Sequence, residues 1–480
     1  MSDSSLSAAE KSELVFKGAR EQAHLVASGD ISSEELVSAH LAQIARVNPA
    51  VNAMVTLVVD SSLEQAREAD KARSSGVKLG ALHGLPIAIK DLQDTAGILT
   101  TQGSPIYKDH VPATDALIVQ RVKNAGAIVI GKSNTPEFGA GSQTFNAVFG
   151  STKNPYDVSK TCGGSSGGAG VALATGMVSI ATGSDLGGSL RNPAAWSNVV
   201  GIRPSPGRVP SVGGDLGWLN LSTDGPMGRT VDDVALQLSV MAGDDPRSPL
   251  SLRESGAQYA GSLERDFKDV RIAWSKDLGG RPIDAENSRV TESVKHVFDD
   301  LGLIVEDDEP DFSTTDEIFQ VLRAYSFAIK HETHLRDHPE KLKETVRWNA
   351  EQGLKQSAID VAHAERLRTR LWEQLLRFFD KHAFLAMPVT SVPPFSIDLE
   401  YPNDINGVVP ETYLDWMWPC YTISVTGLPA MSVPAGFTKD GLPVGLQLVG
   451  RPRGEMGLLQ LASAFESETN FWKQRPSVVR

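Results

Sequence analysis

Cysteine is scarce in this chain: among 480 residues there are only Cys162 and Cys420. Two cysteines cannot form the disulfide framework that is typical of small secreted proteins. Neither is accompanied by a second cysteine or a histidine at the spacing that zinc ligands require. We therefore expect no metal site and no cofactor.

Positive charge and long apolar segments are also scarce. The chain has 46 Lys and Arg against 59 Asp and Glu, and its net charge of −13 disfavours nonspecific binding to nucleic acid, which depends on basic side chains. No apolar stretch reaches the ~18 residues of a membrane span. Residues 1–8 are serine-rich and lack the basic start and apolar segment of a signal peptide. We expect a cytoplasmic protein, a monomer or a homodimer, that binds no membrane and no nucleic acid.

What the sequence does contain is a regular alternation of short apolar segments with helical ones between residues 85 and 204. Strands are expected at 85–90, 127–130, 178–181 and 199–202. This alternation predicts an α/β fold in which a mixed central β-sheet has α-helices on both faces. The turns between these elements should lie at an edge of the sheet, where backbone is free to bind a ligand.

Helices are expected on both sides of this region. Ser32 and Glu35 have the spacing of a capping box, so a helix should begin there, and a second one should span 61–72. Residues 311–380 are charged and helical. The apolar face of this late region repeats every four residues, at Leu367, Leu371, Leu375 and Phe379.

Two glycine-rich turns carry the strongest functional signal. Ser189 follows two glycines in segment 182–191, and Ser165 lies in a similar segment, 162–168. Glycines let the main chain approach a substrate carbonyl closely. A serine nucleophile also needs backbone N–H groups that stabilise the oxyanion it creates. We predict that Ser189 is the nucleophile and that its oxyanion hole consists of the N–H groups of Leu186, Gly187, Gly188 and Ser189.

A nearby histidine does not provide the base for this serine, because none of the ten histidines lies close to either turn in sequence. Lys90 ends the apolar strand 85–90. Full burial can lower the pKa of a lysine by ~3–5 units from ~10.4, which makes its amine a usable base. The neighbouring Asp91 would oppose this shift if it faced the amine. Since adjacent side chains of a strand point to opposite faces, we expect Asp91 to point away from it.

Two further patterns point to other functions. Residues 126–133 fit the P-loop pattern, but the residues between its glycines are those of an expected strand, so we predict no nucleotide site. Residues 164–168 fit the nucleophile elbow of α/β-hydrolases, which would make Ser166 the nucleophile of a Ser-His-Asp triad. No aliphatic strand leads into that turn, so Ser166 remains an alternative only.

Three ordered motifs, at 84–91, 163–168 and 183–194, together resemble those of the amidase signature enzymes. Similar segments at 125–134, 427–430 and 441–447 extend the resemblance over about residues 31–466. In this family the lysine is the base, the first serine of the paired-serine motif has a cis peptide bond and relays the proton, and the later serine is acylated. The resemblance assigns these roles to Lys90, Ser165 and Ser189.

The resemblance also implies a single domain, residues 1–480, with the α/β fold described above. Within it we expect an N-terminal helical segment at 1–75, the amidase signature core at 80–230 and a helical region at 311–380. In this family the last of these regions is variable and covers the active site.

The residues around the catalytic serines are assigned supporting roles. We expect Ser166, Asp185 and Arg191 to orient the turns and balance charge without contacting the substrate. A substrate pocket is expected from loop residues, namely Phe138, Gly141, Phe145, Trp416, Trp418 and Tyr421. Such a pocket favours an apolar or aryl amide, with esters and carbamates (urethanes) as related substrates.

A second function is open to a chain with these motifs, that of the glutaminase subunit of a tRNA-dependent amidotransferase. That subunit reads free glutamine through an acidic residue shortly before the Gly-Leu-Pro turn and an arginine further upstream. Here the approach to Gly427 is aromatic and apolar, and Asp415 is its only acid. A free amino acid has two charged ends that need fixed counter-charges. We therefore expect a stand-alone amidase, and the glutaminase function is the alternative.

Overall fold

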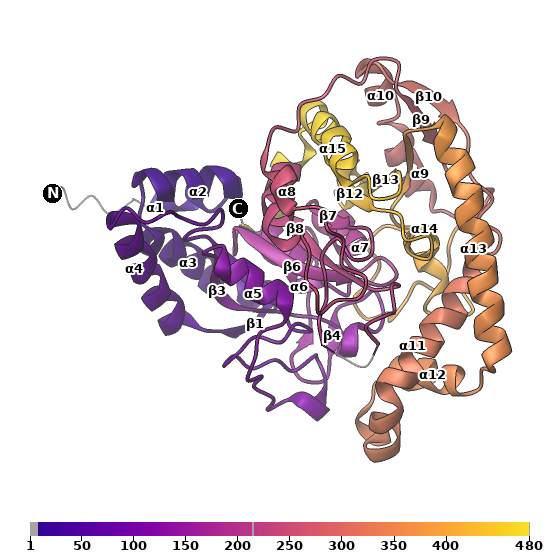
Figure 1. Ribbon diagram of the computed structural model, residues 1–480, viewed down its shortest axis with the longest axis horizontal. Coiled ribbons are helices and arrows are strands. Elements are labelled where there is room, and N and C mark those ends of the chain that lie inside the picture. The colour runs from indigo at the N-terminus through magenta and orange to yellow at the C-terminus, as the bar shows by residue number, and fades with distance from the viewer. Residues whose placement is uncertain (1–7, 214–215, 480) are drawn as a thin grey trace.

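The computed structural model of the chain describes residues 8–213 and 216–479, so residues 1–7, on which the signal-peptide argument rests, lie outside it. Within these ranges eleven strands form one mixed sheet, and helices pack on both of its faces (Figure 1). The predicted α/β fold is confirmed. None of the described helices combines the length and the apolar character that crossing a membrane requires.

The strands follow one another across the sheet in an order that differs from their order in the chain. This order is β1 (Met54–Leu57), β3 (Ile128–Ser133), β2 (Pro86–Lys90), β6 (Ile180–Asp185), β8 (Thr223–Gly228), β7 (Val200–Arg203), β12 (Ala430–Phe437), β13 (Pro443–Gly450), β11 (Phe384–Pro388), β9 (Arg271–Trp274) and β10 (Ile304–Asp307). β2 is parallel to both of its neighbours, β3 and β6. A separate hairpin pairs β4 (Phe145–Asn146) with β5 (Gly150–Ser151).

Helices from distant parts of the chain cover the sheet. One face carries α5 (Leu117–Asn124), α8 (Val231–Met241) and α15 (Glu455–Thr469), and the other carries α6 (Gly167–Ala174) and α7 (Arg191–Ser197). The N-terminal end is built from α1 (Ala8–Leu14), α2 (Ala19–Ser28), α3 (Ser33–Val51) and α4 (Val59–Ser74). The remaining helices are α9 (Ala285–Glu292), α10 (His296–Asp300), α11 (Thr315–Asp337), α12 (Glu344–Leu354), α13 (Ala358–Lys381) and α14 (Trp418–Ser424).

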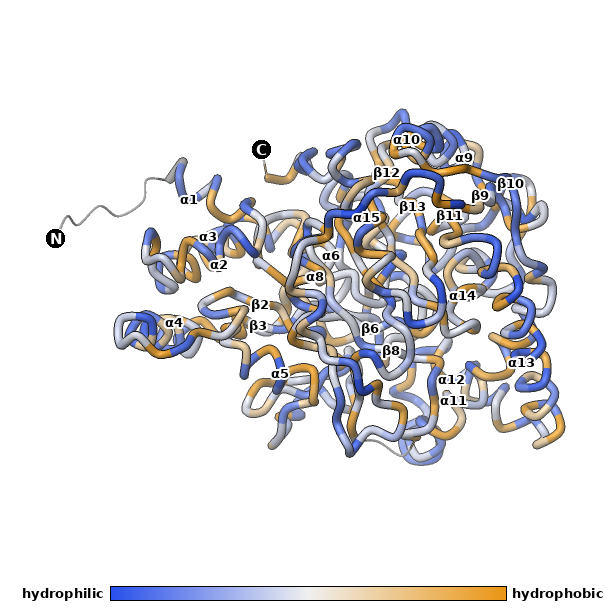
Figure 2. Tube along the Cα trace, turned by 45° about the horizontal axis from the view of Figure 1, so that its top comes forward, coloured by the Kyte–Doolittle hydropathy of each residue, from blue (hydrophilic) through white to orange (hydrophobic). Residues whose placement is uncertain are grey.

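The expected helices form as their sequence signals indicate. The capping box of Ser32 and Glu35 starts α3, and α4 includes the second predicted helix, 61–72. Three of the four apolar residues of α13 are buried, Leu371, Leu375 and Phe379. Outlying helices such as α4 and α13 carry hydrophilic residues along their length, whereas hydrophobic ones gather around the central strands (Figure 2).

The alternation of side chains along β2 determines where its last residue points. Ile87 and Ile89 belong to the apolar cluster that contains residues of α5, α8 and α15, whereas Ala88 belongs to the cluster that contains residues of α6. Lys90 therefore shares the α6 face with Ala88, because strand residues two apart lie on one face. Its side chain points toward the start of α6.

The prediction that the glycine-rich turns lie at a sheet edge is wrong. The relevant strands, β2 and β6, occupy the third and fourth places of the sheet. Because they are parallel neighbours, their carboxyl ends lie at the same end of the sheet, where ligands bind in open α/β sheets. The turns that follow these interior strands thus meet there.

Candidate active site

Lys90 is the centre of the site. Its side chain is fully buried, and its Nζ donates hydrogen bonds to three serine hydroxyls: Ser165 Oγ at 2.7 Å, Ser166 Oγ at 2.9 Å and Ser184 Oγ at 3.0 Å. Burial lowers the pKa of Lys90 to about 7, although the negative charges of Asp224 and Asp185 oppose this shift. A large share of these amines is therefore uncharged near neutral pH, and an uncharged amine can accept a proton from a bound hydroxyl.

Asp91 points away from Lys90, as the alternation of side chains predicts. Its carboxylate accepts hydrogen bonds from the backbone and hydroxyl of Thr101, the latter at 2.5 Å. Burial raises the pKa of Asp91 to about 6, and the nearby charge that opposes this rise is that of Lys132. Asp91 therefore does not hold the amine of Lys90 in its charged form.

Ser165 lies in the turn before α6, and the peptide bond between Gly164 and Ser165 is cis. Two side chains bind the carbonyls of this turn: Ser142 Oγ donates to Gly164 O at 3.1 Å, and Thr144 Oγ1 donates to Gly163 O at 2.8 Å. These contacts fix the turn so that the Ser165 hydroxyl faces Lys90.

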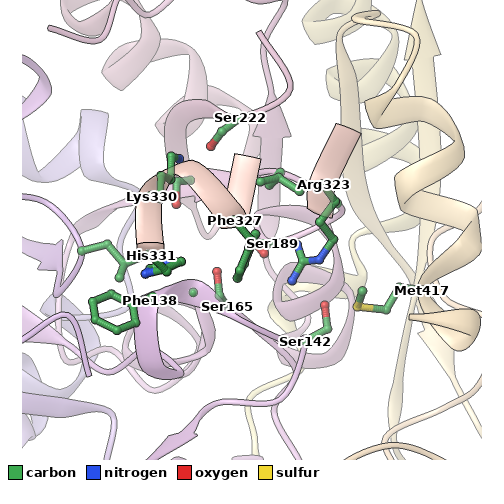
Figure 3. A pocket seen from close by; sticks show the side chains of 16 residues that line it. Phe138, Ser142, Ser165, Ser189, Ser222, Arg323, Phe327, Lys330, His331 and Met417 are labelled. Atoms are coloured by element: carbon green, nitrogen blue, oxygen red, sulfur yellow. The ribbon is translucent and has the colours of Figure 1, made fainter. Parts of the chain in front are cut away.

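Ser189 lies in the turn between β6 and α7, at the floor of a pocket that Ser165 also lines (Figure 3). The N–H groups of Leu186, Gly187 and Ser189 make no hydrogen bond within the described residues, and all three residues line the pocket. The prediction is wrong for Gly188, whose N–H donates to Asp185 Oδ1 at 2.8 Å. Three of the four expected donors are thus available for an oxyanion.

Gly188 serves the turn in another way. Its φ is +123°, and a Cβ at this position would lie 2.5 Å from the Cβ of Cys420. A side chain is therefore excluded both by backbone conformation and by space. Glycine is needed here so that the turn can bend tightly before Ser189.

Asp185 and Arg191 hold the Ser189 turn together from below. The fully buried Asp185 accepts hydrogen bonds from Leu190 N at 3.1 Å and from Arg191 Nη2 at 2.9 Å, and Arg203 Nη1 lies 3.2 Å away. Burial alone would raise the pKa of Asp185, but the two arginines hold it below its usual value. Asp185, Arg191 and Ser166 do not line the pocket, in keeping with an indirect role.

The pocket contains only part of the predicted lining. Phe138 and Gly141 line it, but Phe145, Trp416, Trp418 and Tyr421 do not. Trp416 stacks on Trp196 with ring centroids 5.1 Å apart, and Tyr421 stacks on Phe319 at 4.4 Å. Trp418 lies under the guanidinium of Arg281, and Phe145 under the amine of Lys343. These four rings pack within the protein rather than against a ligand, because other side chains already cover them.

Helix α11 contributes pocket residues that were not predicted from the sequence. Arg323, Phe327, Lys330 and His331 all line the pocket from this helix. Their spacing of i, i+4, i+7 and i+8 is that of a single helix face, which was the available signal. Ser184, the third acceptor of Lys90, was also missed, although it lies inside the motif at 183–194.

The two alternative motifs do not form the sites that their patterns suggest. The hydroxyl of Ser166 contacts Lys90 and the backbone of Ser184, and no histidine bonds to it within the described residues. In segment 126–133, Lys132 is part of β3, and its Nζ donates to Gln93 O at 2.5 Å and to two threonine hydroxyls. Neither a nucleophile elbow nor a phosphate-binding loop is present there.

Comparison with known proteins covers nearly the whole chain. A family model described as Amidase matches residues 35–459. The solved structure of a bacterial aryl acylamidase of the amidase signature enzymes superposes with a TM-score of 0.89 at 27% identity, covering 95% of this chain and 98% of that one.

Two curated relatives with different functions are equally similar to this chain. An acylamidase of Rhodococcus erythropolis is 33% identical, with 97% of this chain and 98% of the relative covered. A subunit of the glutamyl-tRNA(Gln) amidotransferase of Carboxydothermus hydrogenoformans is also 33% identical, with 97% of this chain and 100% of the relative covered. Overall identity therefore does not choose between these two functions.

Proposed function

Because this chain belongs to the amidase signature family of amide-hydrolysing enzymes, we propose that its substrate acylates Ser189, with Lys90 as the base and Ser165 as the proton relay. The observation that carries this proposal is the 2.7 Å hydrogen bond between Lys90 Nζ and Ser165 Oγ inside a buried site. A base so placed can act on Ser189 only through the intervening hydroxyl, since Lys90 does not itself line the pocket.

In the first step, Lys90 accepts a proton from Ser165 while Ser165 accepts one from Ser189, whose Oγ attacks the amide carbonyl carbon. The negative charge that forms on the carbonyl oxygen is stabilised by the N–H groups of Leu186, Gly187 and Ser189. The C–N bond then breaks, and the amine leaves with a proton returned through Ser165. Water hydrolyses the acyl-enzyme by the same path in reverse roles and releases the carboxylic acid.

We further propose that the substrate is an aryl or otherwise apolar amide, with esters and carbamates as slower or related substrates. Apolar side chains from three parts of the chain line the pocket, among them Phe138, Leu186 and Phe327. The similarity to an acylamidase and to an aryl acylamidase supports the same substrate class.

The equal similarity to an amidotransferase component keeps the glutaminase function as the alternative. Two contacts argue against it. The carboxylate of Asp415 accepts hydrogen bonds from the backbone N–H groups of Glu411 and Thr412 at 2.7 and 2.8 Å, so it is held in its own turn. Met417 lines the pocket instead, and no acidic residue is part of the described lining. The α-ammonium of free glutamine would therefore lack a counter-charge.

A comparison of two substrates tests this choice. The purified chain on its own should release 4-nitroaniline from 4-nitroacetanilide and should release no ammonia from glutamine. Both products are measured with and without the partner subunits of an amidotransferase. Hydrolysis of glutamine alone, and only after the partner subunits are added, would show that the glutaminase alternative is correct.

The pH dependence of the rate follows from the state of Lys90. Burial lowers the pKa of Lys90 to about 7, and only the uncharged amine can act as a base. The rate of acylation should therefore rise about tenfold per pH unit below this pKa and level off above it. Pre-steady-state release of 4-nitroaniline between pH 5 and 10 measures this step. A rate that does not change from pH 5 to 9, with acylation limiting, would exclude Lys90 as the base.

A further inference from the structure

Arg323 is a buried cation without an anionic partner. Its side chain is 4% exposed, and none of the ion pairs among residues 8–213 and 216–479 involves it. Its Nε and Nη2 are engaged by neutral groups, Tyr413 Oη at 2.8 Å from Nη2 and Asn349 Oδ1 at 3.2 Å from Nε. Nη1 donates to no group within the described residues. Burying a charge is costly unless a charge of opposite sign accompanies it.

The guanidinium of Arg323 is held in place and lines the pocket. It lies 4.4 Å from the ring centroid of Phe327, one helical turn further along α11 (Figure 3). Since Tyr413 and Asn349 fix its other nitrogens, Nη1 has a defined direction. A fixed guanidinium with a free N–H is suited to bind a carboxylate.

The pocket has two ends, and α11 spans both. One end lies at Phe138, whose ring stacks on His334 of α11 with centroids 5.2 Å apart and lies 4.6 Å from the ring of His331. The other end lies at Arg323, which is about 12 Å away from His331 along the helix at 1.5 Å per residue. In Figure 3 the two ends lie on opposite sides of Ser189.

The Phe138 end belongs to the leaving amine. Ser165 must return a proton to that nitrogen, so the amine has to lie beside Ser165. The next residue after Phe138, Gly139, is so close that a Cβ there would lie 3.4 Å from Ser165 Oγ. Burial lowers the pKa of His331 to about 3, so this end offers aromatic and neutral surfaces. An aryl amine fits such surfaces, which leaves the Arg323 end for the acyl group.

Resting on the proposed function, we propose that the preferred substrate is an aryl amide whose acyl chain ends in a carboxylate bound by Arg323, that is, the monoamide of a dicarboxylic acid. The absence of any acid from the described lining supports this choice, since nothing in the pocket would repel the carboxylate. The other pocket cation, Lys330, already interacts with the negative charge of Asp224. Arg323 has no such interaction and is therefore the anchor.

The test compares each acid with a neutral analogue of the same shape. The acids are the mono-4-nitroanilides of glutarate and succinate, and the analogues are the corresponding methyl ketones, 5-oxohexanoic and 4-oxopentanoic 4-nitroanilide. The wild-type enzyme should show a kcat/KM at least roughly tenfold higher for the better acid than for its ketone. Because each variant is judged by its own acid-to-ketone ratio, a loss of folded protein cancels.

Three variants locate the effect. Arg323→Gln should reduce the ratio by roughly tenfold to a hundredfold, whereas Arg323→Lys should keep part of it. Lys330→Gln removes a cation from the other end of the same helix face and should keep most of it. A ratio near one in the wild type, a ratio that survives Arg323→Gln, or an equal loss in Lys330→Gln would overturn the proposal.

Binding separates this inference from the proposed function. In the Ser189→Ala background, calorimetry should show that the acid binds more tightly than the ketone and that Arg323→Gln removes the difference. If neither anilide is turned over but this binding difference is present, the proposed reaction fails and the carboxylate site stands. If both anilides are turned over and bound equally, the reaction stands and the carboxylate site fails.

Discussion

Replacement of Ser189 by alanine should lower kcat/KM for 4-nitroacetanilide by roughly four to six orders of magnitude, because the variant has no oxygen that can form the acyl-enzyme. The turn should keep its shape, since the backbone carbonyl of Ser189, rather than its hydroxyl, accepts the hydrogen bond from Ser166 N at 3.1 Å. The measurement is the release of 4-nitroaniline, together with mass spectrometry of the acylated protein during turnover. A mass increase on the peptide that contains Ser189 is expected only in the wild type.

Ser166→Ala is the matched control for this prediction. Ser166 contacts Lys90 but does not line the pocket, so its loss should cost far less activity than the loss of Ser189. If Ser166→Ala abolished turnover while Ser189→Ala retained it, Ser166 would be the nucleophile and the role proposed for Ser189 would be wrong.

Replacement of Lys90 by methionine should lower the acylation rate by roughly three to five orders of magnitude. Methionine preserves the length of the buried chain but removes the base. It also leaves the hydroxyls of Ser165, Ser166 and Ser184 without their common donor, so the relay loses its geometry as well. The rate is measured as the pre-steady-state burst of 4-nitroaniline per folded enzyme molecule.

The neighbouring strand supplies the control for this variant. Lys132 in β3 is another fully buried lysine, and burial lowers its pKa to about 8. Its Nζ donates to Gln93 O, Thr95 and Thr100 rather than to a serine of the pocket. Lys132→Met should therefore reduce stability but retain the acylation rate of the molecules that fold. Equal losses of rate in both variants would mean that Lys90 acts only by supporting the fold.

Much of this site follows from local rules that the sequence obeys. Alternation along β2 places Lys90 and Asp91 on opposite sides, and the glycines before Ser189 allow its N–H donors to converge. The availability of Gly188 could not be deduced in the same way. Its N–H bonds to Asp185 because the turn folds back on the end of β6, a contact that depends on the tertiary arrangement.

The pocket walls were the least predictable part. Aromatic residues near the Gly-Leu-Pro turn were expected to face a ligand, but Trp416 and Tyr421 find stacking partners in Trp196 and Phe319, which are distant in sequence. The face of α11 that covers Ser189 carries a readable helical spacing, but the sequence does not state which face of a helix meets the site. Arg323 could be recognised only once its neighbours were known to be neutral.

The proposed reaction depends above all on the amine of Lys90 being uncharged in a large share of molecules near neutral pH. The most direct measurement is an NMR titration of the lysine Cε signals, with Lys90 assigned by its absence from Lys90→Met. We expect this signal to titrate with a pKa of about 7. A signal that remains that of an ammonium up to pH ~10, as in an ordinary lysine, would contradict the proposed role of Lys90.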